Sequence, residues 1–397
     1  MKAQLDAILQ DHIANGEDTK GKLLGATFAV VTKDDVLYLG SAGRTSPDLS
    51  SPAWTDRSFT WIASMSKIIT IAAMLQLVER GLISLDTDCR PLVKELAEAQ
   101  IIDGFDGDTP KLRPNTSPMT LKHLLTHTAG FGVDIADPDL IKWSQVTGRK
   151  VNCHDWSKAG FDVPLKFAPG EGWYYGFSTD WAGQVLEAVT GKRLSEYLQE
   201  NVFDPLGMTE SGFWPRKMTQ ISEEQRAAYL YRQEDGTLKA GLPEFNEEAH
   251  EIESAGAGIF TTGRDYAAFL GALMAGRVVK KETLDVMLTP QINESQEYVL
   301  NLIANMVKDA FAPEFPAEPK LTHGIGGVIN VDDIPEKRNK GSLAWSGAAN
   351  SRWWLDPKAG IAAMIITNVQ PHGDSVMTSL WDKLEKAVYQ NLRSSST

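Results

Sequence analysis

WIASMSKII, residues 61–69, is the stretch around which the chain is organised, because it places a serine and a lysine three residues apart at the start of a long apolar segment. Residues at i and i+3 of an α-helix share one face, with Cβ atoms roughly 5–6 Å apart, so the Lys67 amine can reach the Ser64 hydroxyl. Apolar neighbours solvate an ammonium poorly, and we therefore expect a lowered lysine pKa and an amine able to accept a proton. The competing interpretation is a helix-capping serine followed by a solvated lysine, since the pattern is short.

The sequence on either side of this stretch predicts an α+β fold. Both chain ends carry an amphipathic helix and β-rich runs, the latter at residues 26–32, 36–39, 343–345, 352–355 and 361–366. We expect one antiparallel sheet formed by both chain ends and flanked by the terminal helices, plus a mostly helical domain. The predicted domains are 1–60 with 251–397 for the sheet and 61–250 for the helices, with the active site at their junction.

Within the helical part, we expect a central helix over 64–80 that ends at Gly81, and further helices over 120–127, 181–189 and 194–203. Polar segments that contain proline and glycine, 103–118 and 132–172, are predicted to be loops. Residues 289–340 show weak periodicity and are predicted to be a loop-rich insertion beside the site.

Composition excludes several classes of protein. The 397 residues are 42% hydrophobic, enough for a large core, and carry a net charge of −13, which opposes nucleic-acid binding. The N-terminus lacks the features of a signal peptide, and no run reaches the roughly 18 apolar residues of a membrane span. We therefore expect a soluble, cytoplasmic protein in which Cys89 and Cys153 are reduced thiols.

Motif searches favour neither a metal nor a cofactor. His123 and His127 are four residues apart, but no glutamate follows the first histidine and no third ligand cluster is present, so we expect a hydrogen-bonded structural role for His127. The sequence contains no G-x-S-x-G elbow, no G-x-G-x-x-G that opens a βαβ unit and no P-loop motif. Common serine-hydrolase folds, nicotinamide, flavin and nucleotide chemistry are thus unsupported.

Further motifs accompany the serine and lysine along the chain. They are LLTHTAG at 124–130, PG at 169–170 with a tyrosine downstream, PLGM at 205–208, GAGIFTT at 256–262, GGVI at 326–329, RNKGSL at 338–343 and DPKAG at 356–360. In this order and spacing the chain resembles the serine β-lactamase/penicillin-binding-protein superfamily over essentially its whole length. Within it, the chain is similar to the class C-like carboxylesterases, and most of all to the group of fungal statin acyltransferases and lovastatin-type ester hydrolases.

The resemblance implies a role for each residue that matches the family pattern. Ser64 is expected to attack the ester carbonyl, Lys67 to assist proton removal, and Tyr175 to move the proton between nucleophile and leaving group. The backbone N–H groups of Ser64 and Ala348 are expected to form the oxyanion hole. Tyr174 is the rival for the proton shuttle. In the family, an aspartate and then an apolar helix follow the tyrosine after four residues, and Tyr175 is preferred because its spacing to Asp180 matches this pattern most nearly.

The substrate-binding residues implied by the resemblance come from two stretches. They are Trp173, Tyr174 and Phe177 in one, and Trp345, Ser346 and Gly347 in the other. The chain departs from the β-lactamase pattern here, since Phe177 occupies an asparagine position and Trp345 a lysine position. These changes remove polar partners of a β-lactam and add aromatic surface, which favours neutral esters over penicillins. Alternatively, Trp345 packs in the core.

The function implied is a serine carboxylesterase that acts on a hydrophobic ester through an acyl-enzyme, for example the side-chain ester of a statin-like polyketide. One alternative is an acyltransferase that moves the acyl group onto a polyketide alcohol. The other is a β-lactamase-like or catalytically inactive binding homologue. The expected partner is a small hydrophobic ester, with no nucleic acid and no membrane, and the oligomeric state is left open.

The first prediction concerns the nucleophile. Ser64→Ala should abolish turnover of short-chain 4-nitrophenyl esters while the fold stays intact, because no acyl-enzyme can form. The release of 4-nitrophenolate measures this, with circular dichroism as the check on folding. Ser66→Ala, on the same segment, should retain far more activity; an alanine variant of Ser64 that keeps more than a few per cent would exclude this serine as nucleophile.

Overall fold

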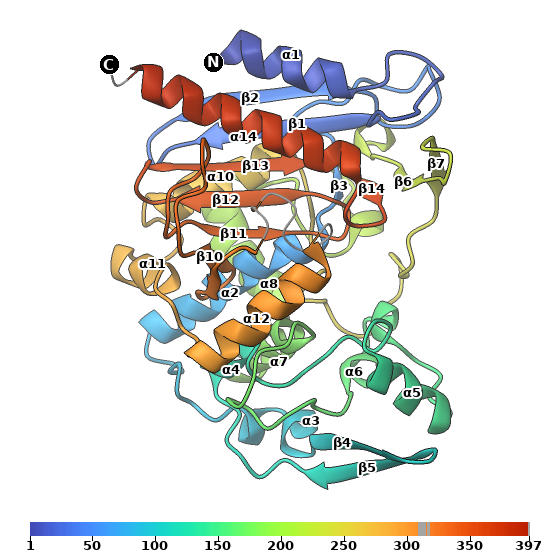
Figure 1. Ribbon diagram of the computed structural model, residues 1–397, viewed down its shortest axis with the longest axis vertical. Coiled ribbons are helices and arrows are strands. Elements are labelled where there is room, and N and C mark those ends of the chain that lie inside the picture. Colours follow the sequence, from blue (N-terminus) through green and yellow to red (C-terminus); the bar gives the residue numbers. More distant parts are fainter. Residues whose placement is uncertain (309–314, 316–317, 396–397) are drawn as a thin grey trace.

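The computed structural model describes residues 1–308, 315 and 318–395 (Figure 1). Its centre is a seven-stranded antiparallel sheet in the order β2-β1-β13-β12-β11-β10-β9. The strands are β1 (Gly25–Val31), β2 (Val36–Gly43), β9 (Leu321–His323), β10 (Val328–Asn330), β11 (Leu343–Ser346), β12 (Arg352–Asp356) and β13 (Ile361–Ile366). The prediction that both chain ends build one antiparallel sheet is confirmed.

Both faces of the sheet are covered, so its central strands are buried along their whole length. Because side chains alternate along a strand, Phe28 and Val30 of β1 point to one face, and Ala29 and Val31 point to the other. The terminal helices α1 (Lys2–His12) and α14 (Ser375–Ser395) pack on the first face (Figure 1). Helix α10 (Gly263–Met274) packs on the second. The terminal helices therefore flank the sheet as predicted.

The rest of the chain is mainly helical and lies on the side of the sheet formed by β11 and β10, away from β1 and β2 (Figure 1). Its helices are α2 (Ser66–Glu79), α3 (Lys94–Ala97), α4 (Leu121–Leu125), α5 (Pro138–Val146), α6 (Lys158–Phe161), α7 (Ser178–Thr190), α8 (Leu194–Leu198) and α9 (Asp204–Leu206). Helices α11 (Lys281–Met287) and α12 (Glu294–Met306) follow α10 in the chain. The central helix α2 is buried on nearly every side. It ends before Gly81, whose φ of +70° is readily adopted only by glycine.

Small sheets complete the fold. They are β3 (Thr60–Trp61) with β8 (Phe260–Thr261), β4 (Gln100–Asp106) with β5 (Thr109–Pro114), and β14 (Val369–Gln370) with β6 (Tyr229–Arg232) and β7 (Leu238–Gly241). The prediction of a loop over 103–118 was wrong, because β4 and β5 form a hairpin there. The two-residue turn is Gly107-Asp108, closed by the pair Asp106 and Thr109, and Gly107 in its first position has a φ of +59°.

The other predicted loops also contain helices. Helices α5 and α6 interrupt 132–172, and α12, β9 and β10 occupy much of 289–340. Helix α12 starts at a capping box in which Asn293 and Gln296 satisfy each other's backbone N–H groups. The part of the loop prediction over 309–314 and 316–317 lies outside the described residues.

Other predictions from composition can be compared with the structure. Cys89 and Cys153 are both free and buried, as expected for reduced thiols. None of the helices in the described part of the chain combines the length and the apolar character that a membrane crossing requires. The seven-stranded sheet draws all its strands from 1–60 and 251–397, while the domain boundaries themselves stay a prediction.

A fully buried ion pair fixes α14 to the loop between β10 and β11, and the second prediction concerns it. Arg338 donates from Nε and Nη2 to the Glu385 carboxylate at 2.8 Å each, and both side chains are 0% exposed. Glu385→Ala removes one partner of this buried pair and should lower the free energy of unfolding by about 3–5 kcal/mol. Urea denaturation measures this loss.

The matched control is Glu98→Ala, which removes a carboxylate from an exposed pair with Lys94. Exposed pairs contribute about 1 kcal/mol or less, so this variant should unfold almost like the parent protein. Equal losses in the two variants would show that the buried pair does not fix the helix.

Candidate active site

Ser64 lies on a strained turn between a strand and the central helix. Strand β3 ends at Trp61, Ala63 adopts a φ of +47°, and residues Ala63–Met65 form a 3₁₀ turn that runs into α2. A positive φ is unfavourable for a residue with a Cβ, and such strain is typical of functional sites. The predicted helix start was therefore too early, since Ser64 precedes α2, but the predicted contact is present: Lys67 Nζ lies 3.1 Å from Ser64 Oγ.

Ser66 proves to be structural. Its side chain is 0% exposed, donates to the Ala63 carbonyl at 2.6 Å and accepts from the Ile259 N–H at 3.0 Å. Ser66→Ala leaves these buried groups unpaired and should lower the free energy of unfolding by about 1–3 kcal/mol. Its activity is therefore compared per folded molecule when it serves as the control for Ser64→Ala.

The Lys67 amine is buried and held from two sides. Its side chain is 5% exposed, and Nζ donates to the Gly256 carbonyl at 2.8 Å as well as to Ser64. Gly256 has to be glycine here, because an added Cβ would lie 2.6 Å from an Asp180 oxygen and 3.0 Å from Lys67 Nζ. The amine is thereby fixed on the side of Ser64 Oγ opposite to solvent.

Asp180, at the start of α7, holds the segment that carries Gly256. Its carboxylate accepts from Ser254 Oγ at 2.6 Å and from the Gly256 N–H at 3.0 Å. Burial raises the pKa of Asp180, and the nearby positive charge of Lys67 opposes this rise. Lys67 is thus supported by Ser254, Gly256 and Asp180, and this role of the three residues was not predicted from the sequence.

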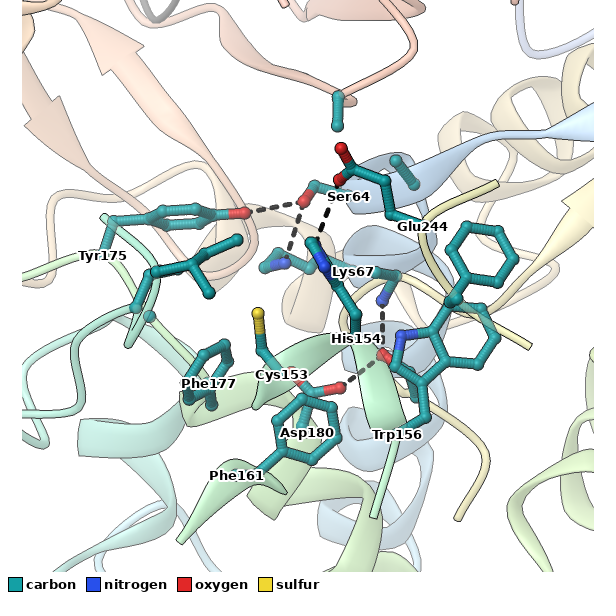
Figure 2. A pocket seen from close by; sticks show the side chains of 18 of the residues that line it. Ser64, Lys67, Cys153, His154, Trp156, Phe161, Tyr175, Phe177, Asp180 and Glu244 are labelled. Carbon is teal, nitrogen blue, oxygen red and sulfur yellow. Dashed lines mark hydrogen bonds and ion pairs between the residues drawn. The ribbon is translucent and has the colours of Figure 1, made fainter. Parts of the chain in front are cut away.

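Tyr175 completes a contact triad with Ser64 and Lys67. Its hydroxyl is hydrogen-bonded to Ser64 Oγ at 2.6 Å, and Lys67 Nζ lies 5.0 Å from the centre of its ring. Figure 2 shows Ser64, Lys67 and Tyr175 converging on one point. The loop that carries Tyr175 packs closely on the segment at Phe131, because a Cβ on Gly176 would lie 2.3 Å from the Phe131 carbonyl oxygen.

Tyr174 points elsewhere. Its hydroxyl donates to Asp137 Oδ2 at 2.7 Å, and burial together with this carboxylate raises the pKa of the phenol. The geometry therefore favours Tyr175 over Tyr174 as the proton shuttle.

Aromatic rings pack behind the triad. The His127 ring lies 4.9 Å from that of Tyr175 and stacks on Trp345 at 6.0 Å, and Trp173 lies at 6.2 Å. The prediction of a hydrogen-bonded His127 side chain was wrong for one atom, because buried Nδ1 has no hydrogen-bond partner among the residues that the structure describes. Burial lowers the pKa of the ring well below its usual value.

The second half of the predicted binding residues lies at the end of β11. An added Cβ on Gly347 would lie 2.3 Å from the Ile62 carbonyl oxygen, so glycine lets this turn approach the Ser64 turn. Ala348 is exposed and lines the same cavity as Ser64, whereas Ser346 Oγ pairs with His372 Nε2 at 3.2 Å. Ser64 and Ala348 thus line one cavity, and the oxyanion role of their backbone N–H groups stays a prediction.

The cavity in front of Ser64 encloses about 790 Å³, including its open mouth, and its lining is mostly apolar, with several aromatic side chains. Of the predicted binding residues, Phe177 lines it, while Trp173, Tyr174, Trp345, Ser346 and Gly347 lie behind or beside it. Trp345 is 8% exposed and packs on Tyr175, so the core-packing alternative fits its position better. Other residues that line the cavity were not predicted from the sequence, among them Trp61, Cys153, His154, Trp156, Phe161, Glu244 and Phe245.

The missed aromatic residues form one wall. Phe245 stacks on Trp156 at 4.3 Å and contacts Trp61 at 4.7 Å, and Phe161 contacts Phe177 at 5.0 Å. A density of aromatic residues in a polar segment, as at 153–161, is the signal that could have indicated them. His123 has a structural role, because its Nδ1 accepts the Thr120 N–H in the cap of α4.

Comparisons with known proteins agree with this geometry. The Beta-lactamase family matches residues 5–385. The chain is 33% identical to the lovastatin esterase of Penicillium rubens over 83% of this chain and 84% of that protein. It is 31% identical to the monacolin J acid methylbutanoyltransferase of Aspergillus terreus over 83% and 81%. A simvastatin synthase mutant from Aspergillus terreus, LovD6, superposes with a TM-score of 0.89 at 27% identity, covering 98% of this chain and 95% of that one.

The third prediction follows from the triad. Because Lys67 and Tyr175 both contact Ser64 Oγ, Lys67→Ala and Tyr175→Phe should each lower kcat for a 4-nitrophenyl ester about 10²–10⁴-fold. The double variant should lose little more than the worse single variant, since residues that act as a unit are not additive. Steady-state kinetics of the four proteins measures the coupling.

Tyr174→Phe is the matched control, because it removes the neighbouring hydroxyl that bonds Asp137. It should change stability more than kcat. Fully additive losses, or a larger kcat loss in Tyr174→Phe than in Tyr175→Phe, would contradict the assignment.

Proposed function

Because the chain belongs to the Beta-lactamase family, we propose that it is a serine carboxylesterase that cleaves a hydrophobic ester through an acyl-enzyme. The observation that carries the proposal is the contact of Ser64 Oγ with both Tyr175 and Lys67 on an aromatic cavity. The substrate we propose is the side-chain ester of a statin-like polyketide, by analogy with the lovastatin esterase of Penicillium rubens.

The first half of the reaction follows from the triad. Ser64 Oγ attacks the ester carbonyl and its proton passes to the Tyr175–Lys67 pair. The carbonyl oxygen becomes negative and is stabilised by the Ser64 and Ala348 backbone N–H groups, which are fixed donors. When the carbon–oxygen bond to the alcohol breaks, the pair returns the proton to the departing alkoxide, and the acyl group stays on Ser64.

The second half reverses these steps with a different nucleophile. A water molecule loses its proton to the same pair, attacks the acyl carbonyl, and releases the carboxylic acid and free Ser64. If an alcohol takes the place of water, the identical chemistry gives a new ester. The second candidate function is therefore acyl transfer to a polyketide alcohol, which the similarity to the methylbutanoyltransferase of Aspergillus terreus favours.

The cavity supports a neutral, hydrophobic substrate. Its lining is mostly apolar and includes the rings of Trp61, Trp156, Phe161, Phe177 and Phe245. Burial of apolar surface contributes roughly 25 cal/mol per Å², so a decalin ring or branched acyl chain gains free energy by leaving water. A β-lactam gains less, because Trp345 stands where the β-lactamase pattern has a lysine for the carboxylate, and Phe177 stands where it has an asparagine for the amide.

The fourth prediction tests the proposed function directly. We expect the purified protein to hydrolyse lovastatin to its alcohol and 2-methylbutyrate, and to cleave a chromogenic cephalosporin much more slowly than simple esters. Mass spectrometry of the products, with and without monacolin J as acceptor in its ring-closed and its open acid form, measures the partition between water and alcohol.

Free acid as the main product in both reactions supports the esterase. An acylated acceptor as the main product would make the protein an acyltransferase. Comparable kcat/KM for the cephalosporin and the esters would overturn the substrate argument, and no turnover of any ester by a folded preparation would leave only the inactive binding homologue.

A further inference from the structure

Two ionisable side chains face each other at the exposed end of the active-site cavity. His154 Nε2 lies 3.3 Å from Glu244 Oε2, and the side chains are 32% and 59% exposed (Figure 2). The other charged groups of the cavity, Lys67 and Asp180, are 5% and 4% exposed at its floor. The His154–Glu244 pair is therefore the charge that a substrate meets first, and the proposed reaction does not use it.

Both members of the pair are held in place by the segments that carry them. His154 lies in a 3₁₀ turn over Cys153–Asp155, where its N–H donates to Asn152 Oδ1 at 2.8 Å. Glu244 directly precedes Phe245, whose ring stacks on Trp156 at 4.3 Å with an angle of 15°. The aromatic contact joins the same two segments as the His154–Glu244 contact, so it holds the imidazole and the carboxylate beside each other.

The surroundings make these charges selective. Apart from the pair and the floor, the cavity is lined mainly by aromatic and aliphatic side chains, which cannot solvate an ionic substrate group. The Glu244 carboxylate repels a second carboxylate, and the His154 imidazole offsets this repulsion when it pairs with Glu244. The net charge of −13 adds a repulsive field for anions.

We propose that Glu244 and His154 set the charge specificity of the enzyme: Glu244 disfavours substrates that bear a carboxylate, and His154 limits that penalty. The inference rests on the proposed esterase function and deepens it, because it names neutral esters, as opposed to carboxylate-bearing ones, as the preferred substrate class. The polyketide substrate is accordingly taken in its uncharged, ring-closed form in preference to the open-chain acid.

A matched pair of esters tests this inference. 4-Nitrophenyl pentanoate and mono-4-nitrophenyl glutarate share the reacting ester and the chain length, and only the glutarate ends in a carboxylate. The readout is the ratio of kcat/KM for glutarate to that for pentanoate, so a general loss of activity in a variant cancels. We expect a ratio well below one for the parent protein.

The two halves of the pair should move this ratio in opposite directions. Glu244→Gln should raise it about tenfold, the effect of one unit charge acting over several ångströms in a partly hydrated site, and His154→Gln should lower it. High salt should shrink both shifts. Glu248→Gln is the control, since it removes the same charge from the same exposed segment, outside the cavity lining, and should leave the ratio within about twofold.

The outcomes separate this inference from the proposed function. Unchanged ratios in Glu244→Gln and His154→Gln, shifts of both in the same direction, or an equal shift in Glu248→Gln would overturn the charge-specificity inference while pentanoate turnover stands. Pentanoate turnover by the parent protein that persists in Ser64→Ala would instead overturn the proposed function, whatever the ratios show.

Discussion

A lysine amine buried beside a serine hydroxyl is the constraint on which the rest of the site depends. An amine removed from water must keep hydrogen-bond partners, and Lys67 finds them in Ser64 Oγ and in the Gly256 carbonyl. That carbonyl is in turn held by Asp180 through the Gly256 N–H and through Ser254. Loss of any of these supports would release the amine from the nucleophile, so segments far apart in the chain are tied to one another at this point.

The fold brings these segments together by closing the chain on itself. The sheet joins β1 to β13, and the turn at Gly347 packs against Ile62, next to the Ser64 turn. Helices α2 and α7 provide Lys67 and Asp180 from the helical side. The active site therefore lies where residues from the sheet and the helices meet, and sheet packing and catalysis depend on the same contacts. The buried Arg338–Glu385 pair contributes to that packing from the far face.

The sequence revealed features that are local and missed those that depend on distant contacts. Runs rich in β-forming residues predicted β1, β12 and β13, and the spacing of Ser64 and Lys67 predicted the contact between their side chains. The Gly256 carbonyl as a partner of Lys67 could not be predicted, because a backbone oxygen has no sequence signature. The contact of Trp156 with Phe245 depends on the path of two loops, so the cavity wall was missed. Two local signals were available and overlooked, Gly107-Asp108 in the hairpin turn and the Asn293 cap of α12.

The central claim is that a substrate's acyl group is transferred to Ser64, and trapping that intermediate tests it most directly. The protein is mixed with 4-nitrophenyl butyrate, quenched in acid before steady state, digested, and analysed by mass spectrometry. Our account predicts one butyryl group per chain, on the peptide that contains Ser64, and none in Ser64→Ala. Butyryl on a different residue of the cavity, such as Cys153 or Tyr175, with Ser64 unmodified, would contradict it.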